Sequence, residues 1–373
     1  MKVIHFSDTH LGYREYHAYD PKQSINQREI DTYQVFNEVI DYIIKIKPDL
    51  VIHAGDLFDS QRPGNRAIST AMFGLSKISK AQIPIVIVAG NHSTPRDRSE
   101  PSILNILKYL PNVYPIYNGK YEKISIGECM IHGIPHMYSS EDLQNALKNL
   151  LPDKSYKYNI FVTHAAIRGI DNIASKEFKE QIIPKSFLSK TFDYIALGHY
   201  HKFIKIQENA YYSGSPEKFS FNEESYENGF LEIELNEFAL KHKSTHNRLM
   251  ETITIECENL ESKNIINVLK EKTNDIENKI IKIQFNKIKK HVWFELDQHA
   301  MKNIMSNTLH YEYDPIIIDK NDDKIEMVTT IGDIKNEYEA YIKKQDMQER
   351  DKKNMLTLGK KYLDEANVSH HEN

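Results

Sequence analysis

Five clusters of metal-capable side chains each follow a short apolar run in the first part of the chain. The clusters are Asp8-Thr9-His10, Gly55-Asp56, Gly90-Asn91-His92, Thr163-His164 and Gly198-His199-Tyr200-His201. Carboxylate, amide and imidazole groups without a thiolate suit Mn²⁺, Fe²⁺ or Zn²⁺ better than a pure Mg²⁺ site. One histidine near a strand end is usually an ordinary polar group, but five such clusters in succession predict a metal centre.

The candidate ligands are too many for one ion. They are Asp8, His10, Asp56, Asn91, His164, His199 and His201. Asp56 is the candidate bridge between two ions, one held by Asp8, His10 and His201 and the other by the remaining three. Two ions about 3.5–4 Å apart can activate water for attack on phosphorus. His92 lies outside this set and is the candidate general acid or phosphate-positioning residue.

The runs that precede these clusters have the length of buried strands. They cover residues 3–6, 50–54, 83–89, 159–163 and 194–197. Helical patterns lie between the first three runs, and residues 30–46 show the clearest 3.6-residue apolar period. This alternation favours an α/β layered fold, in which loops at the carboxyl ends of strands meet in one crevice. Glycines before Asp56, Asn91 and His199 would permit the turns that aim these side chains inward.

The rest of the chain divides into smaller parts. Residues 211–216 and 229–235 suggest added antiparallel strands, so a sandwich of two packed sheets is expected. A strand at 251–256, a helix at 260–277 and a strand at 279–285 indicate a small α+β domain. The predicted domains are 1–245, 246–331 and a helical tail, 332–373. Two apolar stripes in the tail, Ile334/Tyr338/Tyr341/Ile342 and Met355/Leu358/Tyr362, either pack on their own domain or dock on another protein.

The composition is that of a globular chain with a sizeable core: 40% hydrophobic and 27% charged residues. A net charge of −5 gives no overall attraction to nucleic acid or anionic lipid, so a polyanion would need a local patch. The two cysteines, Cys129 and Cys257, fit neither a disulfide framework nor a thiolate zinc site. Because no apolar run reaches membrane-spanning length and no signal peptide opens the chain, we expect a soluble intracellular protein.

Jointly, the metal motifs resemble those of the calcineurin-like metallophosphoesterases. Longer stretches are similar to the Mre-eleven/SbcD family of DNA-repair nucleases, whose archaeal members are nearest in size. These stretches are Phe6-Ser7-Asp8-Thr9-His10-Leu11-Gly12, Gly55-Asp56-Leu57-Phe58, Ala196-Leu197-Gly198-His199-Tyr200-His201 and Tyr212-Ser213-Gly214-Ser215-Pro216-Glu217. The resemblance runs from residue 1 to near residue 240.

The resemblance implies a four-layer sandwich of two mixed sheets flanked by helices, with a small DNA-contacting α+β capping domain and a helical tail. It implies two Mn²⁺ ions per chain, with other divalent ions possible. The implied function is 3′–5′ exonuclease and single-strand or hairpin endonuclease action on DNA ends in double-strand-break repair.

The resemblance also implies partners and a location. The tail would bind a Rad-fifty/SbcC-type ATPase of the SMC class. A homodimer would form through helices at 65–79 and 101–110, with Met72, Phe73, Leu75, Ile103, Leu104 and Leu107 as contact candidates. Ordinary core packing of these residues is an equal alternative. No membrane is involved, and the chain would be cytoplasmic, associated with the nucleoid in an archaeal cell.

Two positions depart from the family pattern. Several members carry His where this chain has Asp59, and Ser93 stands where an acidic residue is usual. In related phosphatases an Asp at the first of these positions hydrogen-bonds the catalytic imidazole. By that comparison, Asp59 should orient His92 and hold it protonated.

Aromatic and basic side chains gather near the metal motifs and could contact DNA. The candidates are Tyr13, Arg14, His17, Arg28, Arg62, Arg96 and Lys202. Taken singly, each is more simply a solvated surface side chain, and only their shared placement supports backbone contact and stacking. Steep loss of binding with salt would be the signature.

Two other functions remain open. A small-molecule phosphodiesterase or phosphomonoesterase would share every ligand, although it would not need the second domain and the tail. A non-catalytic scaffold that binds DNA ends would not need intact ligands or His92.

Overall fold

The computed structural model describes residues 1–169, 181–318, 338–339, 341–343 and 349–368. The chain separates into two compact units, Met1–Ile317 and Ile318–Asn373. The boundary expected between residues 245 and 246 lies inside the first unit and stays a prediction. The boundary expected between 331 and 332 lies outside the described residues.

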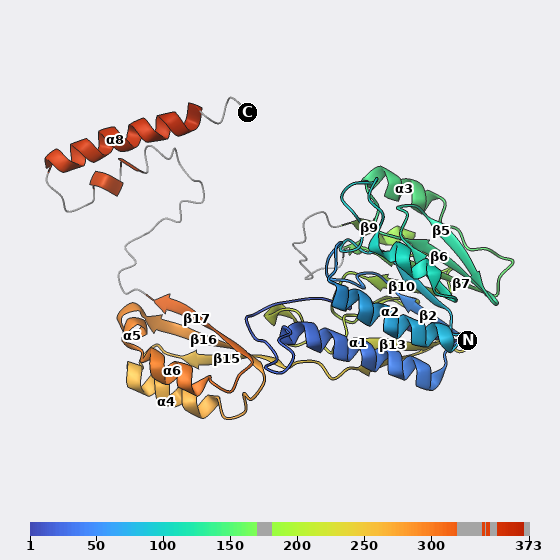
Figure 1. The fold of residues 1–373 in the computed structure, drawn as a ribbon, viewed down its shortest axis with the longest axis horizontal. Coiled ribbons are helices and arrows are strands. Elements are labelled where there is room, and N and C mark those ends of the chain that lie inside the picture. Colours follow the sequence, from blue (N-terminus) through green and yellow to red (C-terminus); the bar gives the residue numbers. More distant parts are fainter. Residues whose placement is uncertain (170–180, 319–337, 340, 344–348, 369–373) are drawn as a thin grey trace. The chain divides into compact units, whose positions relative to one another are not determined.

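The first unit contains a six-stranded sheet in the order β14-β13-β1-β2-β3-β4 (Figure 1). Its strands are β1 (Lys2–Phe6), β2 (Leu50–His53), β3 (Ile85–Val88), β4 (Val113–Ile116), β13 (Gly229–Glu234) and β14 (Ala239–Ser244). Strands β1 to β4 are parallel, whereas β13 pairs antiparallel with β1. The parallel strands are mostly apolar and buried, as expected where both faces of a sheet are covered.

A second six-stranded sheet has the order β11-β12-β10-β7-β6-β5. Its strands are β5 (Glu122–Ile126), β6 (Cys129–Ile134), β7 (Tyr158–His164), β10 (Tyr194–Gly198), β11 (Ile204–Gln207) and β12 (Ala210–Tyr212). A two-stranded sheet, β8 (Ala166–Arg168) and β9 (Ile182–Pro184), stands apart from it. Strand β12 is parallel to β10 and antiparallel to β11. The strand expected at 211–216 is therefore antiparallel to only one of its two neighbours.

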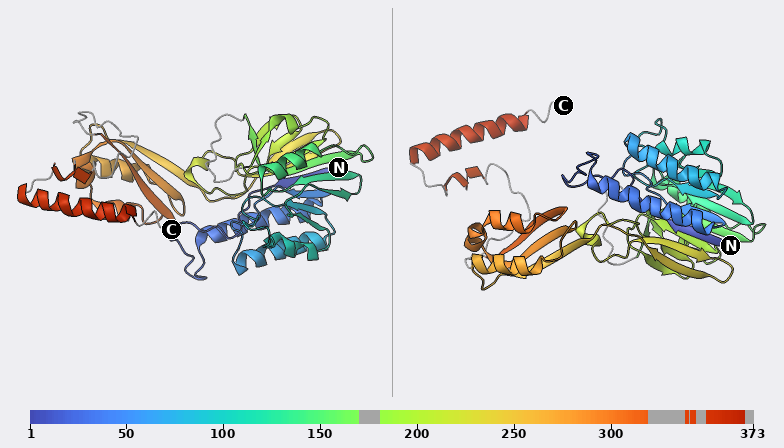
Figure 2. Two further views of the ribbon diagram at one scale, coloured as in Figure 1. Left: turned by 90° about the horizontal axis from the view of Figure 1, so that it is seen from above. Right: turned by 60° about the horizontal axis from the view of Figure 1, so that its bottom comes forward.

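Helices cover the outer faces of the two sheets (Figures 1 and 2). They are α1 (Gln27–Ile46), α2 (Asn65–Lys80) and α3 (Ser140–Lys148), with 3₁₀ turns η1 (Ile103–Tyr109), η2 (Lys185–Phe187) and η3 (Phe221–Glu223). Helix α1 begins where the Asn26 side chain accepts the backbone N–H of Arg28. One apolar cluster joins α1 and α2 to the first sheet, a second lies between the sheets and a third lies under α3. The predicted four-layer α/β sandwich is confirmed.

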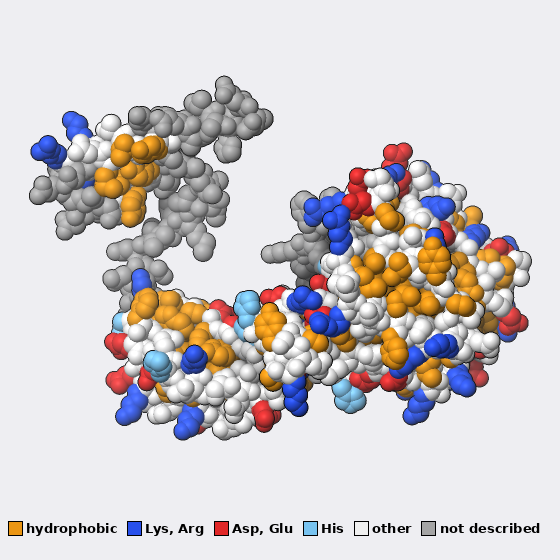
Figure 3. Space-filling view, viewed as in Figure 1, with side chains coloured by type: hydrophobic (Ala, Val, Ile, Leu, Met, Phe, Trp, Pro, Cys, Tyr) orange, Lys and Arg blue, Asp and Glu red, His pale blue; other side chains and the backbone are white. Residues whose placement is uncertain are grey.

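The expected helix at 101–110 is a 3₁₀ helix, and three of the six proposed dimer contacts are buried. Leu75, Leu104 and Leu107 are fully buried in the apolar cluster beneath α1 and α2, so they cannot form a dimer surface. Met72 and Ile103 are half-buried, and Phe73 on α2 is 61% exposed. Apolar side chains gather on the face of the first unit that Figure 3 shows, but we name no dimer contact from them.

The first unit also contains a small α+β module with its own apolar cluster. Its elements are β15 (Met250–Glu256), α4 (Ser262–Lys272), β16 (Ile280–Lys289), α5 (Lys290–Glu295), α6 (Gln298–Ile304) and β17 (His310–Ile318). Strands β15 and β16 are parallel, as the crossover through α4 requires. The predicted strand, helix and strand are present, with the helix shorter at both ends. Among the described residues, no helix is both long and apolar enough to cross a membrane.

In the second unit the structure describes α8 (Glu349–Val368) and a few residues before it. The hydroxyl of Tyr338 donates to the backbone carbonyl of Met355 at 2.7 Å, so the two segments that carry the predicted stripes touch there. Met355, Leu358 and Tyr362 remain exposed on α8. Ile334 lies outside the described residues.

Candidate metal centre

Loops at the carboxyl ends of strands from both large sheets carry the candidate ligands. Asp8 and His10 follow β1, Asp56 follows β2, Asn91 and His92 follow β3, His164 ends β7, and His199 and His201 follow β10. The sequence indicated a crevice at the end of one sheet. The structure instead places the candidate site where the ends of two packed sheets meet.

One group of ligands is centred on His164, which is 1% exposed. Its Nε2 atom lies 3.0 Å from a carboxylate oxygen of Asp56 and 3.0 Å from the amide oxygen of Asn91. Its Nδ1 atom lies 2.9 Å from the carbonyl oxygen of Ala54. The ring of His199 stands beside that of His164, with centroids 5.3 Å apart. A cation near Nε2 could therefore reach a carboxylate, an amide and an imidazole.

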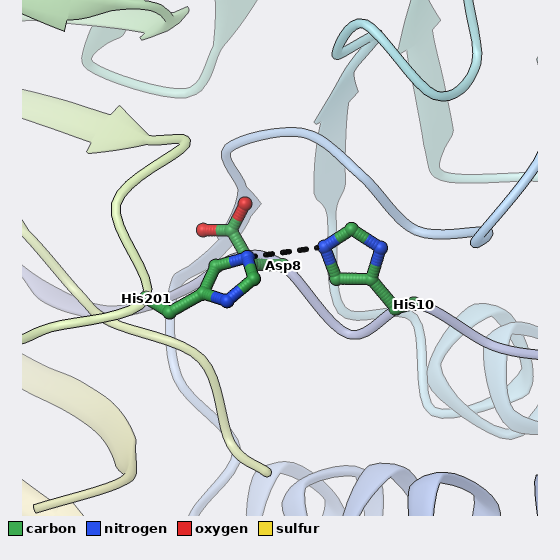
Figure 4. Close-up of side chains that lie close together, drawn as sticks. All are labelled: Asp8, His10 and His201. Carbon is green, nitrogen blue, oxygen red and sulfur yellow. Dashed lines mark hydrogen bonds between the residues drawn. The ribbon is translucent and has the colours of Figure 1, made fainter. Parts of the chain in front are cut away.

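A second group is formed by Asp8, His10 and His201, whose possible ligand atoms all lie within 4.8 Å of one another. The Nε2 atoms of His10 and His201 face each other at 3.2 Å (Figure 4). The Nδ1 atoms of the two rings face carboxylates, at 3.3 Å to Asp59 and 2.9 Å to Glu223.

This arrangement fits a cation. A carboxylate beside Nδ1 favours a proton on that nitrogen, so a neutral imidazole keeps its lone pair on Nε2. The two facing Nε2 atoms of His10 and His201 then repel each other, and a divalent ion bound by both would remove the repulsion. The oxygen and nitrogen donors suit Mn²⁺, Fe²⁺ or Zn²⁺.

The two buried aspartates of the candidate centre are held by the protein itself. Asp8 accepts the Ser7 hydroxyl and the backbone N–H of His199, the latter at 3.2 Å to each carboxylate oxygen. Asp56 accepts the backbone N–H of His92 at 3.0 Å. Both carboxylates are therefore fixed in position before any ion binds.

Comparisons with known proteins identify the family. Residues 1–203 match the calcineurin-like phosphoesterase family. The DNA double-strand break repair protein Mre11 of Methanocaldococcus jannaschii is 34% identical over 311 residues, which cover 79% of each chain. The chain belongs to the Mre11 family of calcineurin-like phosphoesterases.

A second relative, the Mre11 protein of Methanococcus maripaludis, is 34% identical over 54% of this chain and 52% of its own length. A dimetal phosphatase structure from Danio rerio aligns with 65% of this chain and 96% of that one, at 12% identity and a TM-score of 0.41. Membership of the Mre11 family makes this chain a metal-dependent phosphoesterase. The Asp and His groups described above could hold the metal ions that this activity requires.

The backbone of this Mre11-family chain is strained at the candidate ligands. Asp8, His10, Asp56 and His199 all have positive φ angles, of 54°, 43°, 55° and 108°. Non-glycine residues rarely adopt this region, and such strain is concentrated at functional sites. The surrounding sheets must hold these four residues in place. No pattern in the sequence predicts that their backbone is strained.

The glycines before the ligands have two different roles. Gly55 has a φ of +104° and forms a turn, as expected. Gly90 and Gly198 lack a positive φ, and glycine is required there because a side chain would not fit. An added Cβ would lie 2.2 Å from an Asp56 carboxylate oxygen at Gly90, and 2.0 Å from the Ala54 carbonyl oxygen at Gly198. A turn does follow Gly90, where the Ser93 N–H donates to the Gly90 carbonyl at 3.2 Å, but the glycine is required at both positions by close approach.

Replacing Gly198 with alanine is expected to destabilise this Mre11-family protein by about 1–3 kcal/mol, because the clash is with backbone that cannot rotate away. Denaturant unfolding of the metal-free protein measures the change in the free energy of unfolding. Gly64→Ala is the control, since its Cβ would meet only the end of Arg14, at 3.8 Å. Equal stability of the two variants would contradict the packing described at Gly198.

Metal affinity is expected to depend on pH through His164. Burial alone would lower its pKa, but the charge of Asp56 and the hydrogen bond to it raise the pKa to about 9. A divalent ion needs the neutral imidazole and must displace this proton. Below pH 9, Mn²⁺ affinity should therefore rise about tenfold per pH unit and then level off. Calorimetry in buffers of different ionisation enthalpy measures the released proton, and an affinity unchanged between pH 7 and 9 would contradict this assignment.

The structure places Asp59 between His10 and His92. The backbone carbonyl oxygen of Asp59 contacts Nδ1 of His92, and its carboxylate lies 3.3 Å from Nδ1 of His10. A carboxylate oxygen of Asp59 also lies within 4.8 Å of a ring nitrogen of His92, so the role expected for the Asp59 side chain toward His92 stays a prediction. Ser93 is buried, with its carbonyl accepting the Ser102 hydroxyl at 2.8 Å.

The DNA-contact candidates have mixed positions in the structure. Arg14, His17, Arg62, Arg96 and Lys202 are exposed. Tyr13 is half-buried, and its hydroxyl donates to the carbonyl of Phe219 at 2.9 Å.

Arg28 requires a correction, because its side chain is 1% exposed and cannot reach DNA. It pairs with Asp31 at 2.7 Å and with Glu217 at 3.4 Å, and donates to the carbonyl of Lys218. Arg28 lies in the first turn of α1, and the sequence predicts an exposed side chain there until its buried acidic partners are known, one of them far along the chain.

Two neighbours of the centre were missed by sequence reasoning. Glu223 accepts from His201, and the ring of Phe219 packs edge-on against His10 and His201, with centroids 4.9 and 5.1 Å away. Both lie on the segment just after the Tyr212 to Glu217 motif. Their closeness to that motif was the only available signal.

Proposed function

We propose that this chain hydrolyses phosphodiester bonds of DNA with two divalent ions, Mn²⁺ foremost, and processes DNA ends in double-strand-break repair. The finer proposal is 3′–5′ exonuclease and single-strand or hairpin endonuclease action. The observation that carries the proposal is the pair of ligand groups that Asp8, Asp56 and His164 join. The Mre11 relatives, named as double-strand-break repair proteins, supply the substrate class.

Bound ions would supply a water of lowered pKa and neutralise charge on the phosphate. The protein would contribute their placement. Asp8, His10 and His201 would hold one ion, Asn91, His164 and His199 the other, with Asp56 between them. His10 and His164 lie almost entirely out of solvent, so the charges of the site are little screened.

His92 would act on the leaving group. The Asp59 carbonyl favours a proton on its Nδ1 atom, and the Asp56 carboxylate accepts its backbone N–H. Its ring stands edge-on to His10, with centroids 4.8 Å apart. From this position at the half-buried rim, His92 is suited to donate a proton to the departing oxygen or to position the phosphate.

The exposed cations near the loops would contact the DNA backbone. Arg62 reaches Glu100 at 2.9 Å with 84% of its side chain exposed, and Arg14 reaches Glu29 at 2.7 Å with 60% exposed. The Arg62–Glu100 pair is exposed on both sides and therefore weak, so a phosphate could replace the Glu100 carboxylate. Arg96, Lys202 and His17 complete the proposed contact set with Tyr13.

The remaining proposals concern assembly. The exposed stripe Met355, Leu358 and Tyr362 supports docking of α8 on a partner, for which we propose a Rad-fifty/SbcC-type ATPase. We also propose a homodimer without naming its contact residues. An intracellular, nucleoid-associated location goes with this role.

The direct test is hydrolysis of a labelled DNA hairpin by metal-free protein, with Mn²⁺ added or withheld, beside a chromogenic phosphodiester. We expect Mn²⁺-dependent cleavage of DNA, and none by an Asp8→Asn variant prepared in parallel. Turnover of the small ester with DNA left intact would support a small-molecule phosphodiesterase instead. DNA binding without any hydrolysis would support a non-catalytic scaffold.

A further inference from the structure

The two candidate ion positions differ in what stands behind His10 and His201 at one of them and behind His164 at the other. At the Asp8–His10–His201 position, both Nδ1 atoms face carboxylates: Asp59 at 3.3 Å and Glu223 at 2.9 Å. At the other position, Nδ1 of His164 faces the neutral carbonyl oxygen of Ala54 at 2.9 Å, and a carboxylate oxygen of Asp8 lies farther away, at 3.9 Å. The candidate ligands differ in the same direction, since Asp8 is anionic and Asn91 is neutral.

Glu223 is a fixed part of the fold. It is 8% exposed, and its second carboxylate oxygen accepts the backbone N–H of Phe219 at 2.8 Å. The buried ammonium of Lys218 donates to the carbonyls of Glu223, Glu224 and Tyr226, which ties the segment that carries Glu223 into one conformation. The carboxylate is therefore held against His201 by its own surroundings and does not depend on a bound ion.

A carboxylate behind an imidazole fixes the ring and makes the opposite nitrogen a stronger donor. We propose that Glu223 and Asp59 are positioning residues that make the Asp8–His10–His201 position bind its divalent ion more tightly than the Asn91–His164 position. The two ions then load in a set order. This inference rests on the two-ion site of the proposed function and deepens it.

The test is calorimetric titration of Mn²⁺ into the metal-free full chain, with electron paramagnetic resonance counting free and bound Mn²⁺. The wild type should bind in two separate steps. Glu223→Gln should weaken the tighter step about 10- to 100-fold and leave the weaker step within about twofold. Asp59→Asn should act on the same step by a smaller factor, because Asp59 is 32% exposed and more distant.

Matched controls separate this effect from loss of charge alone. Glu38→Gln removes a carboxylate that lies 2.9 Å from His246 on the exposed surface, and Asp41→Asn removes one that pairs with Lys77. Neither should change either binding step. Asp59→Glu, which keeps the carboxylate, should retain most of the affinity that Asp59→Asn loses.

Three results would overturn the inference: two steps of equal affinity in the wild type, unchanged titrations in Glu223→Gln and Asp59→Asn, or loss of the weaker step alone. Metal binding is measured without DNA, so failure of the proposed function can be distinguished from failure of this inference. Ordered binding with no DNA cleavage would reject the nuclease and keep the inference. If Glu223→Gln does not fold, Asp59→Asn decides the outcome.

Discussion

Replacing Asp56 with asparagine is expected to lower Mn²⁺-dependent phosphodiester hydrolysis by about a thousandfold. The change keeps the size of a 2%-exposed side chain but removes the charge of the proposed bridge between the two ions. A metal ion supplies several kcal/mol of charge stabilisation in the transition state, and each 1.4 kcal/mol is a factor of ten. Initial rates at saturating Mn²⁺ measure the loss.

Metal content distinguishes the cause of that loss. The Asp56→Asn protein should bind fewer than two ions per chain, whereas Asp41→Asn, with its carboxylate 67% exposed on α1, should bind as the wild type does. A variant at Asp56 that retained both ions and the wild-type rate would show that this carboxylate does not join the two sites.

Replacing His92 with glutamine is expected to lower the cleavage rate by about 10²–10⁴-fold, the usual contribution of a general acid or base. Both ions should remain bound, because the ligand groups that we assign do not include this ring. The Gln backbone N–H can still donate to Asp56, as the His92 N–H does at 3.0 Å. Single-turnover rates on a labelled hairpin, with metal content measured in the same sample, check both parts.

The leaving group provides a further check on His92. A DNA substrate with a phosphorothiolate linkage, whose sulfur leaves without a proton, should be cut at nearly the same rate by wild type and His92→Gln. An unchanged rate on ordinary DNA, or loss of the ions together with activity, would remove His92 from the proposed role.

Much of the fold could be predicted because local patterns determine it. The apolar run at residues 3–6 became β1, and the stripe at 30–46 became α1, since a buried strand and an amphipathic helix need those periods. The gathering of the candidate ligands could be predicted for a related reason. Each lies at the end of a strand or just after it, and the carboxyl ends of packed parallel strands bring such residues together.

What could not be predicted depends on contacts between distant residues. Arg28 looked like a DNA contact, but it is buried by Glu217, which lies 189 positions away. The contact between the Asp59 backbone carbonyl and Nδ1 of His92 had no signal in the sequence, because the orientation of the loop sets it. Glu223 carries no motif of its own, so only the folded chain shows that it stands behind His201.

The most direct measurement is an anomalous difference map from crystals of the protein grown with Mn²⁺. We expect two peaks about 3.5–4 Å apart, with the Asp56 carboxylate bound to both. One peak should adjoin Asp8, His10 and His201, and the other Asn91, His164 and His199. A single peak, or two peaks that both leave Asp56 uncoordinated, would contradict the two-ion centre.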